Sequence, residues 1–259
     1  MALELAFETT GDGPPVIILH GLFGSRTNWR SVAKRLGASH RVASLDLRNH
    51  GTSPWADSMT YFEMAEDVRA WIDQHGMTRP ALIGHSMGGK VAMALALLHP
   101  ECVRQLVTVD IAPVSYPDEL SVNVQAMLGV DVKAAEARAE VQRQMMQKLN
   151  DMSTVGFLMQ NLVTRDAHFD WRLNLPVINA AMHQLVGFPA ALLERRFEGP
   201  TTVISGSQSD YVKPADRIRY AALFPRAEFV TIEGAGHWVH ADRPEAFVEA
   251  VERALDAAS

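Results

Sequence analysis

The sequence predicts an α/β fold in which a mostly parallel β-sheet carries helices on both faces. Short apolar runs of strand length alternate with segments of helical patterning, which is typical of parallel sheets covered on both sides. The expected strands are Val16–Leu19, Arg41–Leu45, Ala81–Ile83, Leu106–Val109, Thr202–Ser205 and Phe229–Ile232. Because ligands of such folds gather at the carboxyl ends of the strands, we expect the functional residues at that edge.

Composition limits the classes of function. The 259 residues, 47% of them hydrophobic, suffice to bury the core of one domain with an insertion. A net charge of −6 disfavours a nucleic-acid-binding protein. The one cysteine, Cys102, excludes an intrachain disulfide framework and fits a reducing cytoplasm. The N-terminus has no basic secretory signal and no apolar run approaches membrane-spanning length, so we expect a cytoplasmic protein without membrane insertion.

The loop after the strand Val16–Leu19 reads His20-Gly21-Leu22-Phe23-Gly24. Gly21 allows the backbone to turn, so that the amide of Leu22 faces the functional edge of the sheet, with the amide of Phe23 as a neighbouring alternative. Backbone amides are the usual donors that stabilise an oxyanion in acyl transfer. This loop therefore predicts one oxyanion donor.

Polar groups concentrate after the next strand, in the segment Asp46–Gly51. One interpretation makes Arg48 or His50 a contact for an anionic substrate group. We favour the other interpretation, in which Asp46 and Arg48 form an internal polar network that holds the loop.

The strand Ala81–Ile83 leads into Gly84-His85-Ser86-Met87-Gly88, and apolar residues recur at helical spacing from Val91 to Leu98. A sharp turn from strand to helix strains the serine backbone, and the neighbouring glycines make room for it. Gly-x-Ser-x-Gly in this context is the nucleophile elbow. We expect Ser86 to be a nucleophile and the amide of Met87 to be the second oxyanion donor, whereas His85 faces the body in a structural hydrogen bond. The alternative is that the glycines only cap a helix.

The strand Leu106–Val109 ends in Asp110, and the following residues 113–198 show helical patterning without a convincing strand. We expect these residues to form a helical lid inserted after the sixth strand, with residues 1–112 and 199–259 as the core. Six of the twelve methionines lie in the lid: Met127, Met145, Met146, Met152, Met159 and Met182. They either pack the lid against the core, which we favour, or adapt to varied acyl chains.

A serine nucleophile requires a base and an acid that orients the base. His237 follows the strand Phe229–Ile232 on a glycine-rich turn and is the expected base. Asp210, on the loop after Thr202–Ser205, fits the chain order serine, aspartate, histidine and is the favoured acid, with Asp110 as the alternative. His240 has no further ligands around it in the sequence, so we expect no metal and no cofactor.

Two aromatic residues adjoin the expected catalytic loops. Phe23 follows Leu22, and Trp238 follows His237. We expect both to contact the substrate rather than to serve only as core.

The motifs together resemble the α/β-hydrolase superfamily, and more narrowly the YbfF-type esterases related to the abhydrolase-domain 11 proteins. The resemblance spans nearly the whole chain and is carried by His20-Gly21-Leu22-Phe23-Gly24-Ser25, Asp46-Leu47-Arg48-Asn49-His50-Gly51-Thr52-Ser53, Gly84-His85-Ser86-Met87-Gly88-Gly89, Asp110-Ile111-Ala112-Pro113-Val114 and Gly234-Ala235-Gly236-His237-Trp238-Val239-His240. It implies a Ser–His–Asp carboxylesterase or thioesterase that acts on small esters or acyl-CoA-like thioesters. In that family the aspartate of the Asp-Ile-Ala-Pro segment has itself been considered as the acid.

Two further functions fit the same residues. One is cofactor-free perhydrolysis or carbon–carbon bond cleavage on the same triad. The other is a hydrolase-like binding or receptor protein. Dehalogenases and epoxide hydrolases share the fold but carry aspartate at the elbow, so Ser86 disfavours them.

Overall fold

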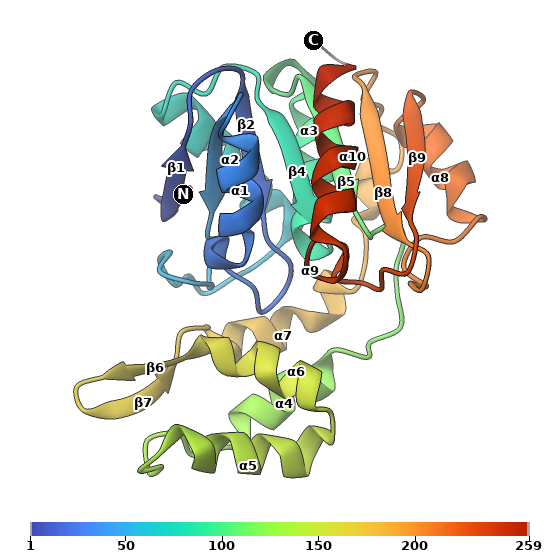
Figure 1. Cartoon of the computed structure of the whole chain (residues 1–259). Helices are drawn as coiled ribbons and strands as arrows, with labels where there is room; N and C mark the ends of the chain where they lie inside the picture. The colour runs from blue at the N-terminus through green and yellow to red at the C-terminus, as the bar shows by residue number, and fades with distance from the viewer. Residues whose placement is uncertain (1, 258–259) are drawn as a thin grey trace.

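The computed structural model describes residues 2–257, and its core is a seven-stranded sheet with the order β1-β3-β2-β4-β5-β8-β9 (Figure 1). The strands are β1 Phe7–Thr10, β2 Pro15–Leu19, β3 Arg41–Leu45, β4 Ala81–His85, β5 Gln105–Val109, β8 Thr201–Gly206 and β9 Ala227–Ile232. Within this sheet of the described residues, only β1 pairs antiparallel, with β3. The predicted mostly parallel sheet is confirmed. The edge strand β1 was not predicted, because its residues Phe-Glu-Thr-Thr contain a single apolar side chain.

Helices cover both faces of the sheet, as the alternation of patterns predicts. On one face lie α1 Arg30–Leu36 and α10 Pro244–Asp256, and on the other lie α2 Tyr61–Gln74, α3 Met87–Leu98 and α8 Asp216–Leu223 (Figure 1). Each face has its own cluster of buried apolar side chains. Helix α3 is buried along almost its entire length because it lies between the sheet and α2. This burial makes α3 a fixed support for the residue that precedes it, Ser86.

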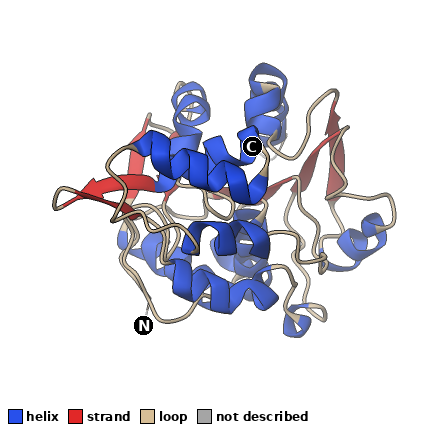
Figure 2. Cartoon of the chain, turned by 90° about the horizontal axis from the view of Figure 1, so that it is seen from below, coloured by secondary structure: helices blue, strands red, loops and turns tan. Residues whose placement is uncertain are grey.

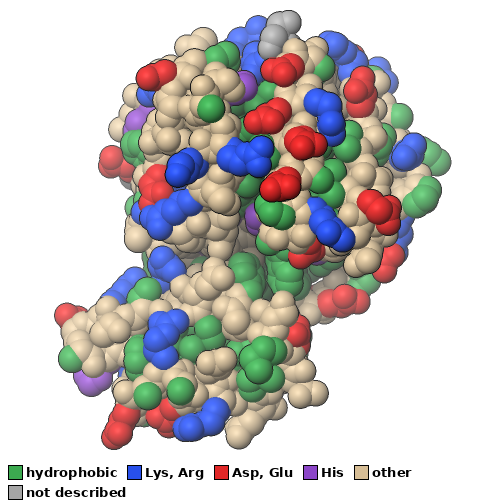
Figure 3. All heavy atoms as spheres, viewed as in Figure 1, with side chains coloured by type: hydrophobic (Ala, Val, Ile, Leu, Met, Phe, Trp, Pro, Cys, Tyr) green, Lys and Arg blue, Asp and Glu red, His purple; other side chains and the backbone are tan. Residues whose placement is uncertain are grey.

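Residues 113–198, which we call the lid segment, lie across the carboxyl ends of the parallel strands (Figures 1 and 2). The segment contains α4 Ser121–Leu128, α5 Arg138–Leu149, α6 Met152–Leu158, β6 Leu162–Arg165, β7 His168–Trp171 and α7 Leu175–Leu185. Hydrophobic side chains gather on it and in the hollow where it meets the core (Figure 3).

Two expectations about the lid segment were wrong. It follows β5, the fifth strand of the chain, rather than a sixth. It also contains the hairpin β6–β7, where no strand was expected. The hairpin strands are only four residues long, and the turn between them uses positive φ at Asp166 and Ala167 without a glycine. The usual turn signal is therefore missing from the sequence.

The remaining helices are short, and they are η1 Arg26–Trp29, η2 Pro100–Cys102, η3 Met159–Asn161, η4 Ala190–Leu192 and α9 Val239–Asp242. Among residues 2–257 no helix is both long and apolar enough to cross a membrane. Of the lid methionines, Met127, Met145, Met159 and Met182 are buried, as expected of residues that pack the lid, whereas Met152 is 64% exposed.

Candidate active site

Ser86 lies on a strained turn between β4 and α3, with φ 50° and ψ −118°. A side chain on either flanking glycine would clash with backbone: a Cβ on Gly84 would lie 2.3 Å from the carbonyl oxygen of Gly88, and a Cβ on Gly88 would lie 2.4 Å from that of Leu19. The amide of Ser86 donates to the carbonyl of Val109 at 3.0 Å, which ties the turn to β5. The glycines therefore have a structural reason beyond helix capping, and the turn presents Ser86 to a cavity that it lines.

His237 lies on the loop between β9 and α9, and its Nδ1 lies 2.7 Å from Oδ2 of Asp110. The Asp110 side chain is completely buried. It also accepts hydrogen bonds from the amide of Gly206 at 3.1 Å and from the hydroxyl of Ser209. With Nδ1 donating to the carboxylate, Nε2 of His237 is left free to accept a proton. Ser86 and His237 line the same cavity, although no direct hydrogen bond joins them within residues 2–257.

The prediction that Asp210 pairs with His237 was wrong, because the carboxylate that contacts His237 is that of Asp110. Asp210 is exposed, and it forms no hydrogen bond or ion pair with the described residues. Asp110 reaches His237 because β5 is next to β8, and β8 is next to β9. Chain order does not reveal this adjacency.

The two neighbours of Asp210, Ser209 and Tyr211, contact Asp110 and His237, which the sequence did not predict. The Ser209 hydroxyl donates to Asp110, and the ring of Tyr211 stacks on that of His237 with the centroids 4.0 Å apart. Tyr116 from the lid segment holds this loop by donating to the carbonyl of Tyr211 at 2.6 Å. Residues 205–211, which begin at the end of β8, are rich in hydroxyl side chains, and this marks them as candidates. The sequence does not show which of these hydroxyls faces Asp110.

The candidate oxyanion donors are the amides of Leu22 and Met87. Neither amide has an acceptor within residues 2–257. Met87 is the first residue of α3, so its N–H has no partner inside the helix. The amide of Phe23, the alternative, already donates to Nε2 of His50 at 3.2 Å. That bond leaves Leu22 as the donor that this loop can offer.

Buried histidines support both loops of the candidate site. Burial lowers the pKa of His50 to about 3, which keeps Nε2 an acceptor for Phe23, while Nδ1 donates to the carbonyl of Arg48 at 3.0 Å. Burial likewise holds the pKa of His85 well below its ordinary value, and its Nε2 donates to the carbonyl of His237 at 2.9 Å. The structural hydrogen bond expected of His85 is present.

The polar segment Asp46–Gly51 forms an internal network, as we favoured. Arg48 is buried and binds the carboxylate of Asp67 through Nε at 2.7 Å and Nη2 at 2.9 Å. The carboxylate of Asp46 accepts from Arg26 and from the amide of Thr52. Neither Arg48 nor His50 lines the cavity at Ser86.

The cavity at Ser86 has a volume of about 660 Å³, and the lid segment forms part of its wall. Phe23 and Trp238, the two expected substrate contacts, both line it, and Trp238 contacts the ring of Phe157 from α6 at a centroid distance of 5.5 Å. His240 stacks on Trp29 at 4.2 Å, and burial lowers its pKa to about 4. No cluster of three or more metal-ligating side chains occurs within residues 2–257.

Comparison with known proteins decides the family. The profile of the alpha/beta hydrolase fold matches residues 14–244. The chain belongs to the α/β-hydrolase family. This α/β-hydrolase is 37% identical to the mouse protein "sn-1-specific diacylglycerol lipase ABHD11" over 92% of its own length and 80% of that protein's. It is 36% identical to "Esterase YbfF" of Escherichia coli, with 93% of each chain covered.

A solved structure extends the likeness to three dimensions. "Marine microorganism esterase" superposes on this α/β-hydrolase with a TM-score of 0.94 at 35% identity, covering 97% of this chain and 99% of that one.

Proposed function

We propose that this α/β-hydrolase cleaves small carboxylic esters or acyl thioesters through an acyl-enzyme, with Ser86 as nucleophile, His237 as base and Asp110 as the acid that orients His237. The observation that carries the proposal is the 2.7 Å hydrogen bond from His237 Nδ1 to buried Asp110, beside a strained serine in one cavity. Relatives named as esterases and a lipase support ester cleavage. The thioester alternative follows from the shared acyl-transfer chemistry.

The geometry supports a two-step reaction. Ser86 Oγ attacks the carbonyl carbon while Nε2 of His237 takes its proton, and the amides of Leu22 and Met87 donate to the oxygen that becomes negative. The tetrahedral intermediate collapses, and the alcohol or thiol leaves with the proton held by His237. Water then attacks the acyl-enzyme, with His237 as base, which releases the acid and restores Ser86.

Asp110 stabilises the imidazolium of His237 that forms in each step. Its buried carboxylate accepts from Gly206, Ser209 and His237, so it is held in one orientation. The stacked ring of Tyr211 restricts rotation of His237 from the other side. The base is therefore oriented before substrate binds.

Hydrolysis of p-nitrophenyl acetate by Ser86→Ala tests the proposal. We expect the variant to lose at least about 10⁴-fold in kcat, because the nucleophile is removed. Ser115→Ala, at an exposed serine of the lid segment, is the matched control and should retain the wild-type rate. Turnover by Ser86→Ala at more than trace level contradicts the proposal, and a wild-type protein that binds esters without turnover indicates a binding protein.

A further inference from the structure

Ser86 lies between two cavities of very different size. The outer cavity, of about 660 Å³, is lined by His237, Trp238 and Phe157. The inner cavity, which we call the inner chamber, has a volume of about 30 Å³. Ser86 and Leu22 line both cavities, whereas His237 lines only the outer one. Leu120 and Tyr211 also line both cavities. The inner chamber is further lined by Tyr61, Met87, Lys90, Tyr116, Met182 and Leu185.

The chemistry of acyl transfer assigns a substrate group to each cavity. When Ser86 attacks, the oxyanion must face the amides of Leu22 and Met87, and the leaving group must face His237, which gives it a proton. The leaving group therefore lies in the outer cavity, where His237 is. The acyl substituent points away from His237, toward the chamber that Met87 lines.

We propose that the inner chamber binds the acyl group of the substrate and restricts it to about two or three carbons, while the outer cavity takes a larger alcohol or thiol. This inference rests on the proposed function and names its substrate class. A volume of about 30 Å³ holds about two water-sized groups, since one such group needs roughly 10–15 Å³. An acetyl or propionyl chain fits that space.

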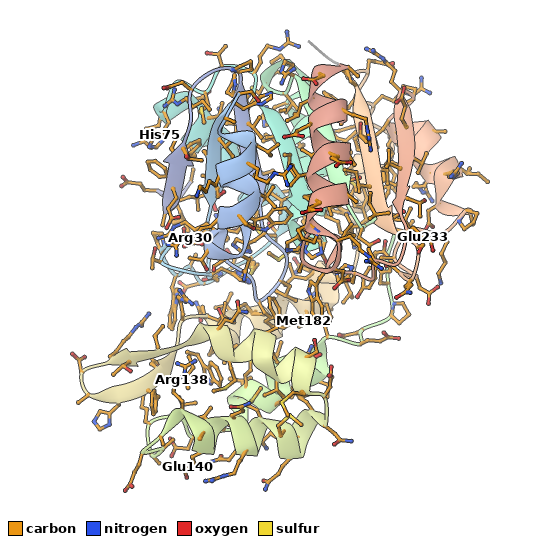
Figure 4. The ribbon with its side chains drawn as sticks, viewed as in Figure 1. Arg30, His75, Arg138, Glu140, Met182 and Glu233 are labelled. Atoms are coloured by element: carbon orange, nitrogen blue, oxygen red, sulfur yellow. The ribbon has the colours of Figure 1, made fainter. Side chains whose placement is uncertain are left out.

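The part of the inner chamber's wall that comes from α2 and α7 consists of closely packed side chains. Tyr61, Met182 and Leu185 are at most 5% exposed, and Tyr61 donates its hydroxyl proton to the carbonyl of Leu185 at 2.6 Å. Figure 4 shows Met182 where the lid segment meets the core. A longer acyl chain must displace these side chains, which a close-packed wall resists. The Tyr61 hydroxyl is already paired, and the Nζ of Lys90 already donates to two carbonyls, so the chamber favours an apolar acyl group.

Lys90 joins the two helices that form the chamber. It lies on α3, directly after the nucleophile turn, and its Nζ donates to the carbonyls of Val186 at 3.0 Å and Gly187 at 2.6 Å, just past the end of α7. The same Nζ lies 4.7 Å from the centroid of the Tyr116 ring. Lys90 thereby ties α7, which carries Met182 and Leu185, to the helix that holds Ser86, and so fixes the chamber's size.

A series of p-nitrophenyl esters with one leaving group and acyl chains of two, three, four, six and eight carbons tests the assignment. For wild type we expect kcat/KM to fall at least about tenfold from propionate to hexanoate. Met182→Ala should enlarge the chamber and raise the hexanoate-to-acetate ratio of kcat/KM at least about fivefold. Met159→Ala, at a buried lid methionine outside both cavities, is the matched control and should leave that ratio within about twofold.

Three further variants test the assignment of the two cavities. If Met182→Ala does not fold, Met182→Val and Leu185→Ala should each shift the ratio in the same direction. Phe157→Ala, in the outer cavity only, should change the preference among ethyl, benzyl and naphthyl acetates without changing the acyl ratio. An unchanged acyl profile in every chamber variant, or an acyl shift from Phe157→Ala, overturns the assignment.

Failure of this inference is distinguishable from failure of the proposed function. If hydrolysis depends on Ser86 but the acyl profile does not respond to the chamber variants, only the chamber assignment is wrong. If Ser86→Ala retains turnover, the proposed function itself is wrong.

Discussion

Nδ1 of His237 donates to Oδ2 of Asp110 at 2.7 Å, although the two residues lie 127 positions apart in the chain. The contact forms because β5 and β9 flank the same strand, β8, and because Asp110 and His237 both follow the carboxyl ends of their strands. The order of strands thus brings Gly206, Ser209 and His237 together around the carboxylate of Asp110, which accepts a hydrogen bond from each of them.

Substitution of the two candidate acids separates their roles. Asp110→Asn should lower kcat by roughly 10²–10⁴-fold, because the amide no longer stabilises the imidazolium and favours the wrong tautomer of His237. Asp210→Asn should retain kcat within about twofold, since Asp210 is exposed. Steady-state kinetics on one chromogenic ester measure both, and a larger loss from Asp210→Asn would contradict the account.

Glycine patterns made much of the candidate site predictable. Gly84 and Gly88 mark the turn at Ser86, where a Cβ on either would meet backbone, and a Cβ on Gly21 would lie 2.9 Å from the His85 ring. Gly234, with a φ of 71°, turns the chain before His237, the candidate base. These positions depend on local geometry, which the sequence encodes directly.

The contact between Asp110 and His237 and the inner chamber both depend on packing between distant segments. Choosing Asp110 over Asp210 requires the order of strands, and the chamber requires α7 to pack over α3. The hairpin β6–β7 escaped prediction because its turn lacks glycine. Each of these features is set by tertiary packing rather than by a local motif.

A substitution at the elbow tests whether its glycines are required by sterics. In Gly88→Ala the new Cβ meets the Leu19 carbonyl at 2.4 Å, so we expect a loss of stability of about 2–4 kcal/mol together with loss of activity. Gly156→Ala in α6, where no atom lies within 4 Å, should be neutral or stabilising by up to about 1 kcal/mol. Urea unfolding measures both, and equal stabilities for the two variants would refute the steric argument.

The buried imidazole of His50 predicts a pH dependence of stability. Its pKa is about 3 in the folded protein, below the ordinary value of 6.5, so the unfolded chain binds more protons between those values. The contribution of neutral His50 to the free energy of unfolding is fully present above pH 6.5 and is lost as the pH falls toward 3. The expected slope is about 1.4 kcal/mol per pH unit at most.

His50→Gln should remove that slope while its amide replaces both hydrogen bonds of the imidazole. Urea unfolding of wild type and variant at pH 7, 6, 5 and 4 gives the comparison. As the pH falls below 6.5, the free energy of unfolding of the wild type should fall relative to that of the variant, because only the wild type takes up a proton at position 50 on unfolding. Parallel curves for the two proteins would show that His50 does not titrate as its burial requires.

Covalent labelling with a fluorophosphonate probe tests the central claim, that Ser86 is an activated nucleophile, most directly. Intact-mass spectrometry of the wild-type protein should show the addition of one phosphonyl group, peptide mapping should place it on Ser86, and Ser86→Ala should show none. Asp110→Asn should label more slowly than wild type, because His237 is then poorly oriented. Labelling of Ser86→Ala at the wild-type rate, or modification of a different residue in wild type, would contradict the account.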